Sequence, residues 1–426
     1  MYDKFRNFEV KEMKQTTYIA KGTKAFGRTT LAMFFGGFNT FAIMYSTQPL
    51  LPVFSREFHI SPAVASLSLS LTTMALALSM LFVGSLSEVK GRKPLMNFSL
   101  ISASVLAILT AFVPNYSFLL LFRVLQGIAL AGLPAVAMAY LSEEIEPGDL
   151  GVAMGLYISG VSVGGMTGRI IIGVLTDLFN WRVALGTVGV LSVAASLFFA
   201  YLLPPSQHFQ SRPLEIKPLL KSMVNHLKDP SLLCLYGIAF FILGSFVTLY
   251  NYIGYQLIAP PYSLSQTLVG FIFVIYIVGT FSSTWMGRQA DIHGPIKMLW
   301  SGLLLMALGA YLTLHMSLVI KILGIALFTF GFFGSHSIAS SWVGRQALHD
   351  KAQASSLYLF FYYAGSSTGG TSGGTFWQAF GWVGVISLIL GFLICAFLLS
   401  IRLNFISHLN RQRKKTLTPK KQTVNV

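Results

Sequence analysis

Apolar residues fill twelve long stretches of the chain, and polar or charged residues mark the breaks between them. A helix needs about 20 mostly apolar residues to cross the hydrocarbon core of a bilayer. Because each stretch approaches or exceeds that length, the pattern predicts twelve transmembrane helices. They are expected at residues 29–50, 63–86, 95–113, 118–140, 152–175, 183–202, 233–256, 267–286, 297–314, 319–342, 354–376 and 383–401.

The longest break separates the sixth and seventh stretches and is rich in proline, lysine and polar residues. We expect it to be a soluble linker, residues 203–232, between two six-helix bundles at 29–202 and 233–401. Polar and basic tails, 1–28 and 402–426, flank the bundles. The predicted fold class is an all-α membrane protein with twelve transmembrane helices in two six-helix bundles.

The composition argues against a soluble protein. Of 426 residues, 54% are hydrophobic and 10% are charged, whereas soluble proteins carry roughly 25% charged residues. The two cysteines, Cys234 and Cys395, both lie in apolar stretches. Two such residues make neither a disulfide framework nor a zinc site, and we expect no metal and no cofactor.

The charges are unevenly placed. Lys and Arg number 30 against 14 Asp and Glu, a net charge of +16 that alone would suggest a nucleic-acid partner. However, 25 of the 30 lie in the tails, the linker and every second loop, and three, Arg56, Arg182 and Lys321, are assigned to the opposite loops. Because cytoplasmic loops are enriched in Lys and Arg, both termini are predicted to be cytoplasmic. The excess then fits anionic lipid at that face, and no nucleic acid is expected.

The two halves of the chain repeat a loop and a helix. The loops after the second and eighth helices share the pattern G-x-x-small-acid-x-x-G, 203 residues apart, with Gly84, Glu88 and Gly91 matched by Gly287, Asp291 and Gly294. Glycines of the fifth helix recur in the eleventh, 205 residues later: Gly160, Gly164, Gly165 and Gly168 match Gly365, Gly369, Gly370 and Gly373. Parallel six-helix repeats are one architecture of secondary transporters, which bind substrate between the repeats.

Three motifs carry a resemblance to a known family. The loop motif is matched at Gly84, Leu86, Gly91, Arg92 and Lys93, with Glu88 for the usual Asp. The fourth-helix motif is matched at Leu119, Arg123, Gln126, Gly127 and Ala131. The fifth-helix antiporter motif is matched at Gly151, Gly160, Gly164 and Gly168, with Gly165 and Arg169 where Pro and Gly are usual. The chain thus resembles the major facilitator superfamily over nearly its whole length. Segments 140–145, 155–160, 251–255 and 353–358 resemble the YnfM-type bacterial inner-membrane transporters.

The resemblance implies two pseudo-symmetric bundles that move a small-molecule substrate across the bacterial inner membrane by alternating access. It favours proton-coupled efflux. It assigns a gating loop that latches the bundles together in the outward-open state, formed by Gly84, Glu88, Gly91, Arg92, Lys93 and Asp291. It also implies that the fifth-helix glycines, Gly160, Gly164, Gly165 and Gly168, pack against the eighth helix of the chain, which belongs to the other bundle. The alternative is that these glycines serve helix packing alone. We expect a monomer and, because no set of nucleophile, base or metal ligands converges, no enzyme.

Two arginines lie inside predicted helices, and no Asp or Glu lies within a helix body. Charged residues within the membrane are costly and usually functional. Arg123 and Arg169 therefore need other compensation, from backbone carbonyls, Gln126, tyrosine hydroxyls, water or an anionic substrate. This leaves an alternative to proton-coupled efflux: a carrier, importing or exchanging, of an organic or inorganic anion bound by both arginines. Snorkelling to the membrane surface is the third interpretation.

In the superfamily, helices 1, 4, 7 and 10 surround the substrate cavity. Their polar residues are therefore candidates for binding or coupling: Asn39, Tyr45, Ser46, Gln48, Tyr250, Asn251, Tyr252, Tyr255 and His336. Tyrosine-rich walls suit amphipathic ligands, and His336 titrates closest to neutrality among the embedded groups. The alternative is that these side chains form hydrogen bonds between helices.

Overall fold

The computed structural model describes residues 18–211, 216–347 and 349–417. The described part is helical, apart from one isolated β-bridge between Ile19 and Ile145. The first half comprises α1 (Lys24–Tyr45), η1 (Gln48–Leu50), α2 (Leu51–Glu57), α3 (Pro62–Lys90), α4 (Arg92–Thr110), α5 (Tyr116–Leu130), α6 (Gly132–Glu144), α7 (Leu150–Leu178) and α8 (Trp181–Leu202). The second half comprises α9 (Ile216–Lys228), α10 (Pro230–Ile258), α11 (Gln266–Phe271), η2 (Ile272–Ile275), α12 (Tyr276–His293), α13 (Pro295–Leu312), α14 (Leu318–Gln346) and α15 (Lys351–Leu417).

Ten helical stretches of the described chain are long and apolar enough to cross a membrane, with α5–α6 and α11–η2–α12 each forming one stretch. One of the ten, α15, contains two helices, because its backbone is not helical at Gly381. α1 is not among the ten, yet it packs along α7 and α8 inside the first bundle. With α1 and both parts of α15, the described residues contain the twelve predicted spans.

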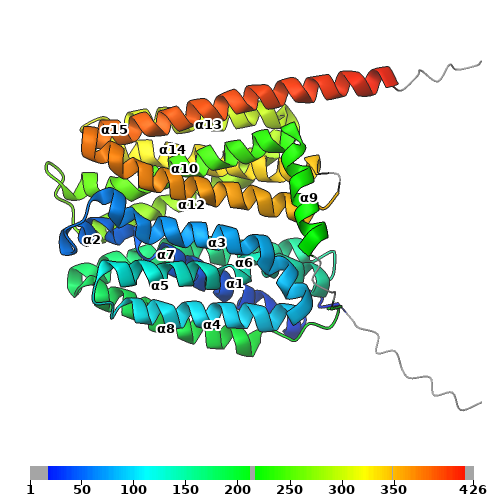
Figure 1. Ribbon diagram of the computed structural model, residues 1–426, viewed down its shortest axis with the longest axis horizontal. Helices are drawn as coiled ribbons and strands as arrows, with labels where there is room; N and C mark the ends of the chain where they lie inside the picture. The colour runs from blue at the N-terminus through cyan, green and yellow to red at the C-terminus, as the bar shows by residue number, and fades with distance from the viewer. Residues whose placement is uncertain (1–17, 212–215, 348, 418–426) are drawn as a thin grey trace, which may run out of the picture.

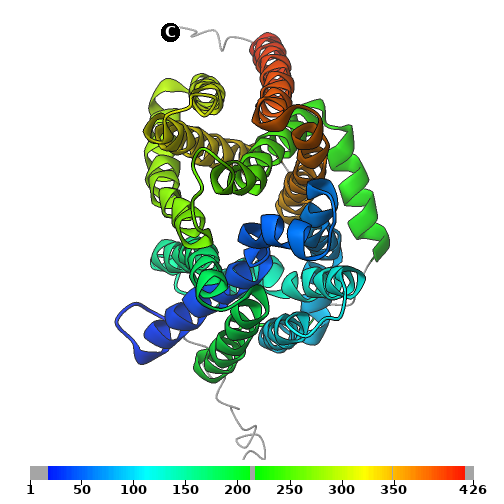
Figure 2. The same ribbon diagram turned by 90° about the vertical axis from the view of Figure 1, so that its left-hand side faces the viewer.

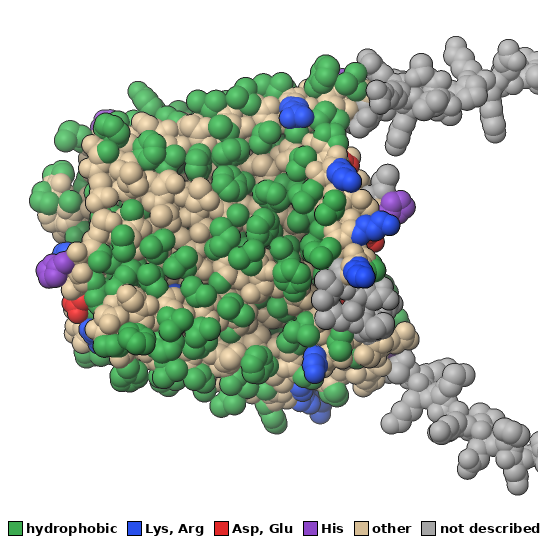
Figure 3. Space-filling model, in the orientation of Figure 1, with side chains coloured by type: hydrophobic (Ala, Val, Ile, Leu, Met, Phe, Trp, Pro, Cys, Tyr) green, Lys and Arg blue, Asp and Glu red, His purple; other side chains and the backbone are tan. Residues whose placement is uncertain are grey.

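The helices run roughly parallel and form two groups, with α1–α8 in the lower half of Figure 1 and α10–α15 in the upper half. Figure 2, a view from one end, shows the same two bundles. We call the end where α1 begins and α15 finishes the tail side, and the end that carries α2 the far side. Hydrophobic side chains cover the middle of the face shown in Figure 3, and most of its visible Lys and Arg lie along the tail side. This distribution fits a bilayer around the middle of the molecule.

The repeated loop ends two helices in the same way. α3 ends before Gly91 and α12 ends before Gly294, and these glycines have φ of 92° and 93°. Residues with a side chain rarely adopt such values, whereas glycine does so at little cost. Both motif glycines are therefore required by the turn that follows each helix.

The fifth-helix glycines pack within their own bundle. A Cβ at Gly160 or Gly164 of α7 would overlap the backbone of Phe34 or Phe38 of α1. The second bundle repeats this contact 205 to 206 residues later, where Gly365 and Gly369 of α15 meet Phe240 and Gly244 of α10. The internal repeat found in the sequence is thus also a repeat of helix packing.

This arrangement corrects one expectation. The face formed by Gly160, Gly164 and Gly168 was predicted to meet the eighth helix of the other bundle, but it meets α1. Gly165, on a different face, lies beside the Arg169 guanidinium instead. Four-residue spacing places glycines on one helix face, but it does not determine which neighbour that face meets.

The two bundles meet along two seams. One seam joins α3 to α15, and the other joins α7 to α11 and η2. At the second seam, Gly173 of α7 lies against Gly270 of α11, where an added Cβ would come within 3.3 Å of the Gly270 Cα. Gly173 is the fifth-helix glycine that meets the other bundle, and it lies outside the motif.

The two parts of the predicted linker pack on different bundles. The buried Glu144 carboxylate at the end of α6 accepts hydrogen bonds from the amides of Gln207 and His208, at 2.8 and 3.0 Å. α9, later in the same linker, packs instead on α10 and α15. The start of the linker is therefore held by the first bundle and α9 by the second.

Candidate functional site

Arg123 lies in α5, with 1% of its surface exposed, and binds backbone carbonyls. Its Nε donates to the Ser68 carbonyl at 2.7 Å, Nη1 to Ile43 at 3.1 Å, and Nη2 to Met44 at 2.5 Å. Nη1 also donates to Gln126 Oε1 at 2.7 Å. The Ile43 and Met44 carbonyls belong to the last turn of α1, and the carbonyl end of a helix favours a cation.

These contacts favour a structural role for Arg123. An arginine has five N–H donors, and four hydrogen bonds to protein groups leave one of them for a ligand. Compensation by backbone carbonyls and Gln126 was one of the interpretations left open by the sequence. Arg123 ties α5 to the end of α1 and to α3.

Arg169 of α7 is equally buried but is held differently. Its Nε donates to Gln48 Oε1 at 2.7 Å, and its Nη1 donates to the Gly165 carbonyl at 2.5 Å. No hydrogen bond from Nη2 to another described residue occurs. The guanidinium therefore keeps donors that the protein does not use.

Three aromatic rings surround the Arg169 guanidinium. The ring centres of Tyr45, Phe273 and Tyr276 lie 4.0, 4.6 and 5.1 Å from its central carbon. Aromatic faces attract a cation within about 6 Å, so the rings offset part of the cost of burial. Tyr45 belongs to the first bundle, and Phe273 and Tyr276 belong to the second. The cation therefore lies at the seam between the bundles.

Gln48 links this arginine to the second bundle. Its Nε2 donates to Asn251 Oδ1 of α10 at 2.8 Å. The Asn251 Nδ2 is buried and has no hydrogen-bond partner. We call this group the Arg169 cluster: Tyr45, Gln48, Arg169, Asn251, Phe273 and Tyr276. Besides Arg169, it brings together three predicted site residues: Tyr45 and Gln48 from the first predicted span and Asn251 from the seventh.

Further polar contacts join the bundles on the far side. The Tyr255 hydroxyl donates to the Leu51 carbonyl at 2.8 Å and lies 2.7 Å from Ser55 Oγ. Asp177 at the end of α7 accepts hydrogen bonds from the first two amides of α11, at 3.2 and 2.7 Å. The far side is therefore closed by contacts between the bundles.

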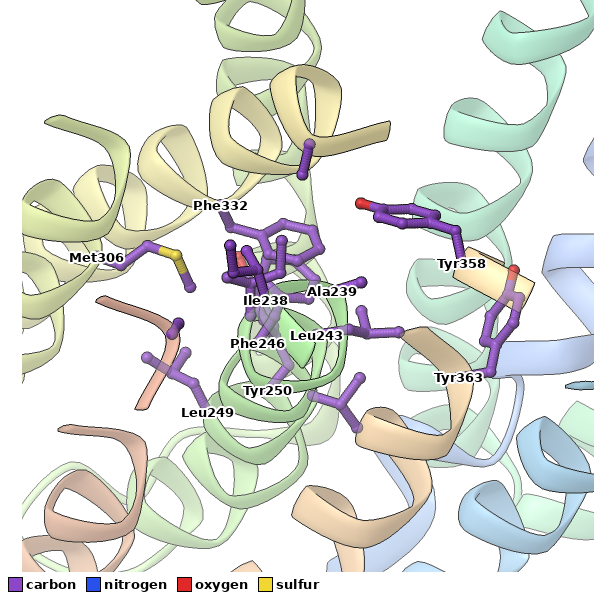
Figure 4. Packing of buried hydrophobic residues seen from close by; sticks show 14 of the residues in the cluster. Ile238, Ala239, Leu243, Phe246, Leu249, Tyr250, Met306, Phe332, Tyr358 and Tyr363 are labelled. Atoms are coloured by element: carbon purple, nitrogen blue, oxygen red, sulfur yellow. The ribbon is translucent and has the colours of Figure 1, made fainter. Parts of the chain in front are cut away.

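An aromatic cluster extends from the Arg169 cluster into the second bundle. Phe246 and Phe332 stack with ring centres 3.8 Å apart (Figure 4). His336 Nδ1 lies 3.0 Å from the Tyr358 hydroxyl, and its ring stacks on Tyr362 at 4.5 Å. Figure 4 shows the Tyr358 hydroxyl pointing toward Phe332. Here His336 is a hydrogen-bonded member of an aromatic wall.

Several other candidates make hydrogen bonds between or within helices. Asn39 Nδ2 bonds Ser104 and Ser196 inside the first bundle, at 3.3 and 2.8 Å. Ser46 Oγ donates to Ile43 in its own turn, and Tyr252 donates to Gly370 at 2.5 Å. Tyr250 pairs with Thr329 Oγ1 at 2.8 Å. These contacts match the alternative that the sequence left open for cavity residues.

The gating loop makes its polar contacts within the first bundle. Arg92 donates to both carboxylate oxygens of Glu143, at 2.6 and 3.2 Å, while Glu88 lies 4.0 Å away. Arg92 also bonds Ser87, and Lys93 bonds the Leu203 carbonyl. In the second bundle, the exposed Asp291 pairs with Arg345 of α14 at 3.5 Å. Neither loop is hydrogen-bonded across the bundles in the state described.

Two kinds of residue escaped the sequence reasoning. Phe273 and Tyr276 were not predicted, because they lie in the eighth predicted span, residues 267–286, and the cavity was expected between helices 1, 4, 7 and 10. Lys321 was assigned to a loop, but it lies in the first turn of α14 with 1% exposure. Its ammonium bonds the Thr313 carbonyl near the Trp382 ring. Apolar residues on both sides of Lys321 are the signal that would have revealed its burial.

Comparison with known proteins fixes the family. The model of the Major Facilitator Superfamily matches residues 33–260. The uncharacterized MFS-type transporter YybF of Bacillus subtilis is 56% identical over 384 residues, covering 90% of this chain and 95% of that protein. The chain belongs to the major facilitator superfamily. The inner membrane transport protein YnfM of Escherichia coli is 46% identical over 389 residues, covering 91% and 93%. The predicted family, YnfM-type similarity and absence of enzyme function are confirmed, and the chain is a multi-pass membrane transporter.

Solved structures show the same fold. A bacterial homolog of the human lysosomal transporter Spinster, inward-facing and occupied, has a TM-score of 0.71 at 17% identity, covering 89% of this chain and 96% of that one. The peptide transporter POT in complex with sulfate has a TM-score of 0.71 at 13% identity, covering 89% and 94%. At such identities the likeness concerns the fold alone.

Proposed function

We propose that this transporter carries small organic anions with an aromatic or apolar body, and that Arg169 binds their acidic group. The observation that carries the proposal is a buried cation at the seam between the bundles with unused donors and no acidic partner among the described residues. A buried charge is costly unless it is paired, and a guanidinium pairs well with carboxylate or phosphate. The adjacent rings and the unpartnered Asn251 Nδ2 suit the rest of such a ligand.

The test is ligand-induced stabilisation of the purified protein. Aromatic carboxylates should raise the melting temperature, and their uncharged amides should not. Arg169→Met should abolish the shift, while Arg182→Met, at an exposed pair with Glu57, should retain it. Equal stabilisation by acids and amides in the wild type would contradict the proposal.

Proton-coupled export is a second candidate, and it concerns coupling rather than the ligand. It is supported by the position of His336, a titratable side chain in the aromatic wall. In proteoliposomes, a pH gradient should drive uptake of radiolabelled substrate identified by the stabilisation screen. His336→Gln should lose the response to the gradient but retain exchange, whereas the exposed His315→Gln should behave as the wild type. A response that persists in His336→Gln would exclude this residue as the coupling group.

We also propose that the tail side is cytoplasmic, with both termini there and anionic lipid around it. The excess of Lys and Arg along this side supports the orientation (Figure 3). The far-side contacts between the bundles would then lie at the outer surface of the membrane. Impermeant thiol reagents on whole cells should label a cysteine at Arg56 but not one at Lys297. The reverse pattern would overturn the orientation.

A further inference from the structure

α9 presents three different faces around its axis. Consecutive residues of a helix are rotated by about 100°, so residues four apart lie nearly above one another. Leu219, Ser222 and Met223 form the buried face against the second bundle. Leu220 and Val224, exposed by 46% and 49%, form an apolar stripe on one flank. Next to that stripe, exposed lysines lie along the side opposite the bundle: Lys217, Lys221 and Lys228.

The helix lies where the surface of a membrane would be. Figure 1 shows α9 at the tail side, nearly perpendicular to the spanning helices, and Figure 2 shows it at the outer edge of the molecule. A helix with an apolar flank beside a lysine stripe binds in the plane of a membrane surface, with its apolar side at the headgroup boundary. Lysines at that level attract anionic headgroups.

α9 is also fixed to the helix that forms one of the seams. Ser222 Oγ donates to Asp350 Oδ2 at 2.6 Å, and His226 Nε2 donates to the Asp350 carbonyl at 3.2 Å. Asp350 directly precedes α15, which packs on α3 of the first bundle. A ligand held by α9 is therefore attached, through Asp350, to the helix that packs on the other bundle.

We propose that α9 is a membrane-surface helix that binds anionic phospholipid headgroups through Lys217, Lys221 and Lys228, with Leu220 and Val224 at the acyl boundary. This goes beyond the transport function, because it assigns a lipid site outside the substrate path. The charge and the adjacent apolar stripe together select an anionic lipid surface rather than an acidic soluble protein, which would leave the stripe in water.

The test uses the full-length protein with both native cysteines replaced by alanine. A fluorophore on Val224→Cys is compared with one on Asn225→Cys, an exposed position about 100° further round the helix. The protein is reconstituted in vesicles of phosphatidylcholine carrying brominated acyl chains, with or without phosphatidylglycerol. We expect bromine to quench the label at 224 more than that at 225, and phosphatidylglycerol to increase the quenching at 224.

Charge reversal at all three lysines, Lys217→Glu, Lys221→Glu and Lys228→Glu, should remove the effect of phosphatidylglycerol. Lys297→Glu, at another exposed tail-side lysine, should leave it intact. All four side chains are exposed, and the melting temperature checks that each variant is folded. Equal quenching at 224 and 225, or an effect of phosphatidylglycerol that survives charge reversal, would overturn the proposal and leave α9 as a site for a soluble partner or for none.

Discussion

The first helices of the two bundles, α1 and α10, differ at equivalent positions: one is broken and the other is continuous. α1 ends at Tyr45 and is followed by η1 and α2, whereas α10 continues unbroken to Ile258. At the break, Arg123 donates to the Ile43 and Met44 carbonyls, and Ser46 also donates to the Ile43 carbonyl. In the second bundle, residues 206 positions later form a neutral pair: Tyr250 takes the place of Met44, and Thr329 that of Arg123. A buried cation therefore lies at the end of the broken helix, and a neutral pair lies at the equivalent place beside the continuous one.

The fifth and eleventh helices differ in a related way. Arg169 of α7 reaches Gln48 at one seam, and Gly374, 205 residues later in α15, packs against Ala63 of α3 at the other. One seam therefore contains a cation and polar side chains, and the other a close approach of two helices. Helix packing is repeated in both bundles, while Arg169 breaks the symmetry at the place where ligand binding is proposed.

The largest expected effect is at the broken helix. Arg123→Met would remove four hydrogen bonds that a buried cation makes, and a hydrogen bond to a charged group contributes about 1.5–3 kcal/mol. Thr329→Val, at the equivalent position, should cost less, about 1–3 kcal/mol, because it removes only the two neutral hydrogen bonds to Tyr250 and Ile325. Unfolding of purified protein in detergent measures both. Similar losses at the two positions would show that the cation at the broken helix contributes no more than the neutral pair.

The glycine contacts should respond equally in the two bundles. Gly164→Ala and Gly369→Ala each drive a Cβ into the facing backbone, and overpacking costs about 1–3 kcal/mol. Gly155→Ala and Gly391→Ala serve as controls, because nothing lies within 4 Å of the added atom. Melting temperatures should fall for the first pair and not for the controls. A fall in one bundle alone would show that the repeat in packing is incomplete.

The smallest effect is expected at the loop of the second bundle, and the change in the matching loop of the first bundle should cost more. Arg92 is 8% exposed and holds both Glu143 oxygens, so Arg92→Met should cost about 1–3 kcal/mol. Arg345→Met breaks an exposed pair and should cost under about 1 kcal/mol. Chemical unfolding of each variant measures the loss in the free energy of unfolding, and equal losses would show that the two loops are equivalent. The two loops differ because Pro295 occupies the position in the second bundle that Arg92 occupies in the first. Beside Asp291 and Arg345 lies a cavity of about 360 Å³.

Much of the architecture follows from local pattern. The span lengths predict the twelve helices, and the matched loop glycines predict turns that the structure shows at Gly91 and Gly294. The candidate site was predicted less completely. Gln48 and Asn251 were named and do meet, but Phe273 and Tyr276 were not, because contacts across a seam leave no periodic trace in either helix. Lys321 was misplaced for a related reason, since its burial depends on Trp382 and Thr313.

The sequence by itself determined the number of spans, the two-bundle repeat and the presence of two cations without acids in the membrane interior, because length, periodicity and charge are local properties. Only the tertiary structure decided how each cation is compensated. Arg123 meets carbonyls at the end of a broken helix, and Arg169 meets aromatic rings of the other bundle. The physical reason is that a buried charge is stabilised by whatever dipoles and rings lie within a few ångströms, and these come from residues far away along the chain.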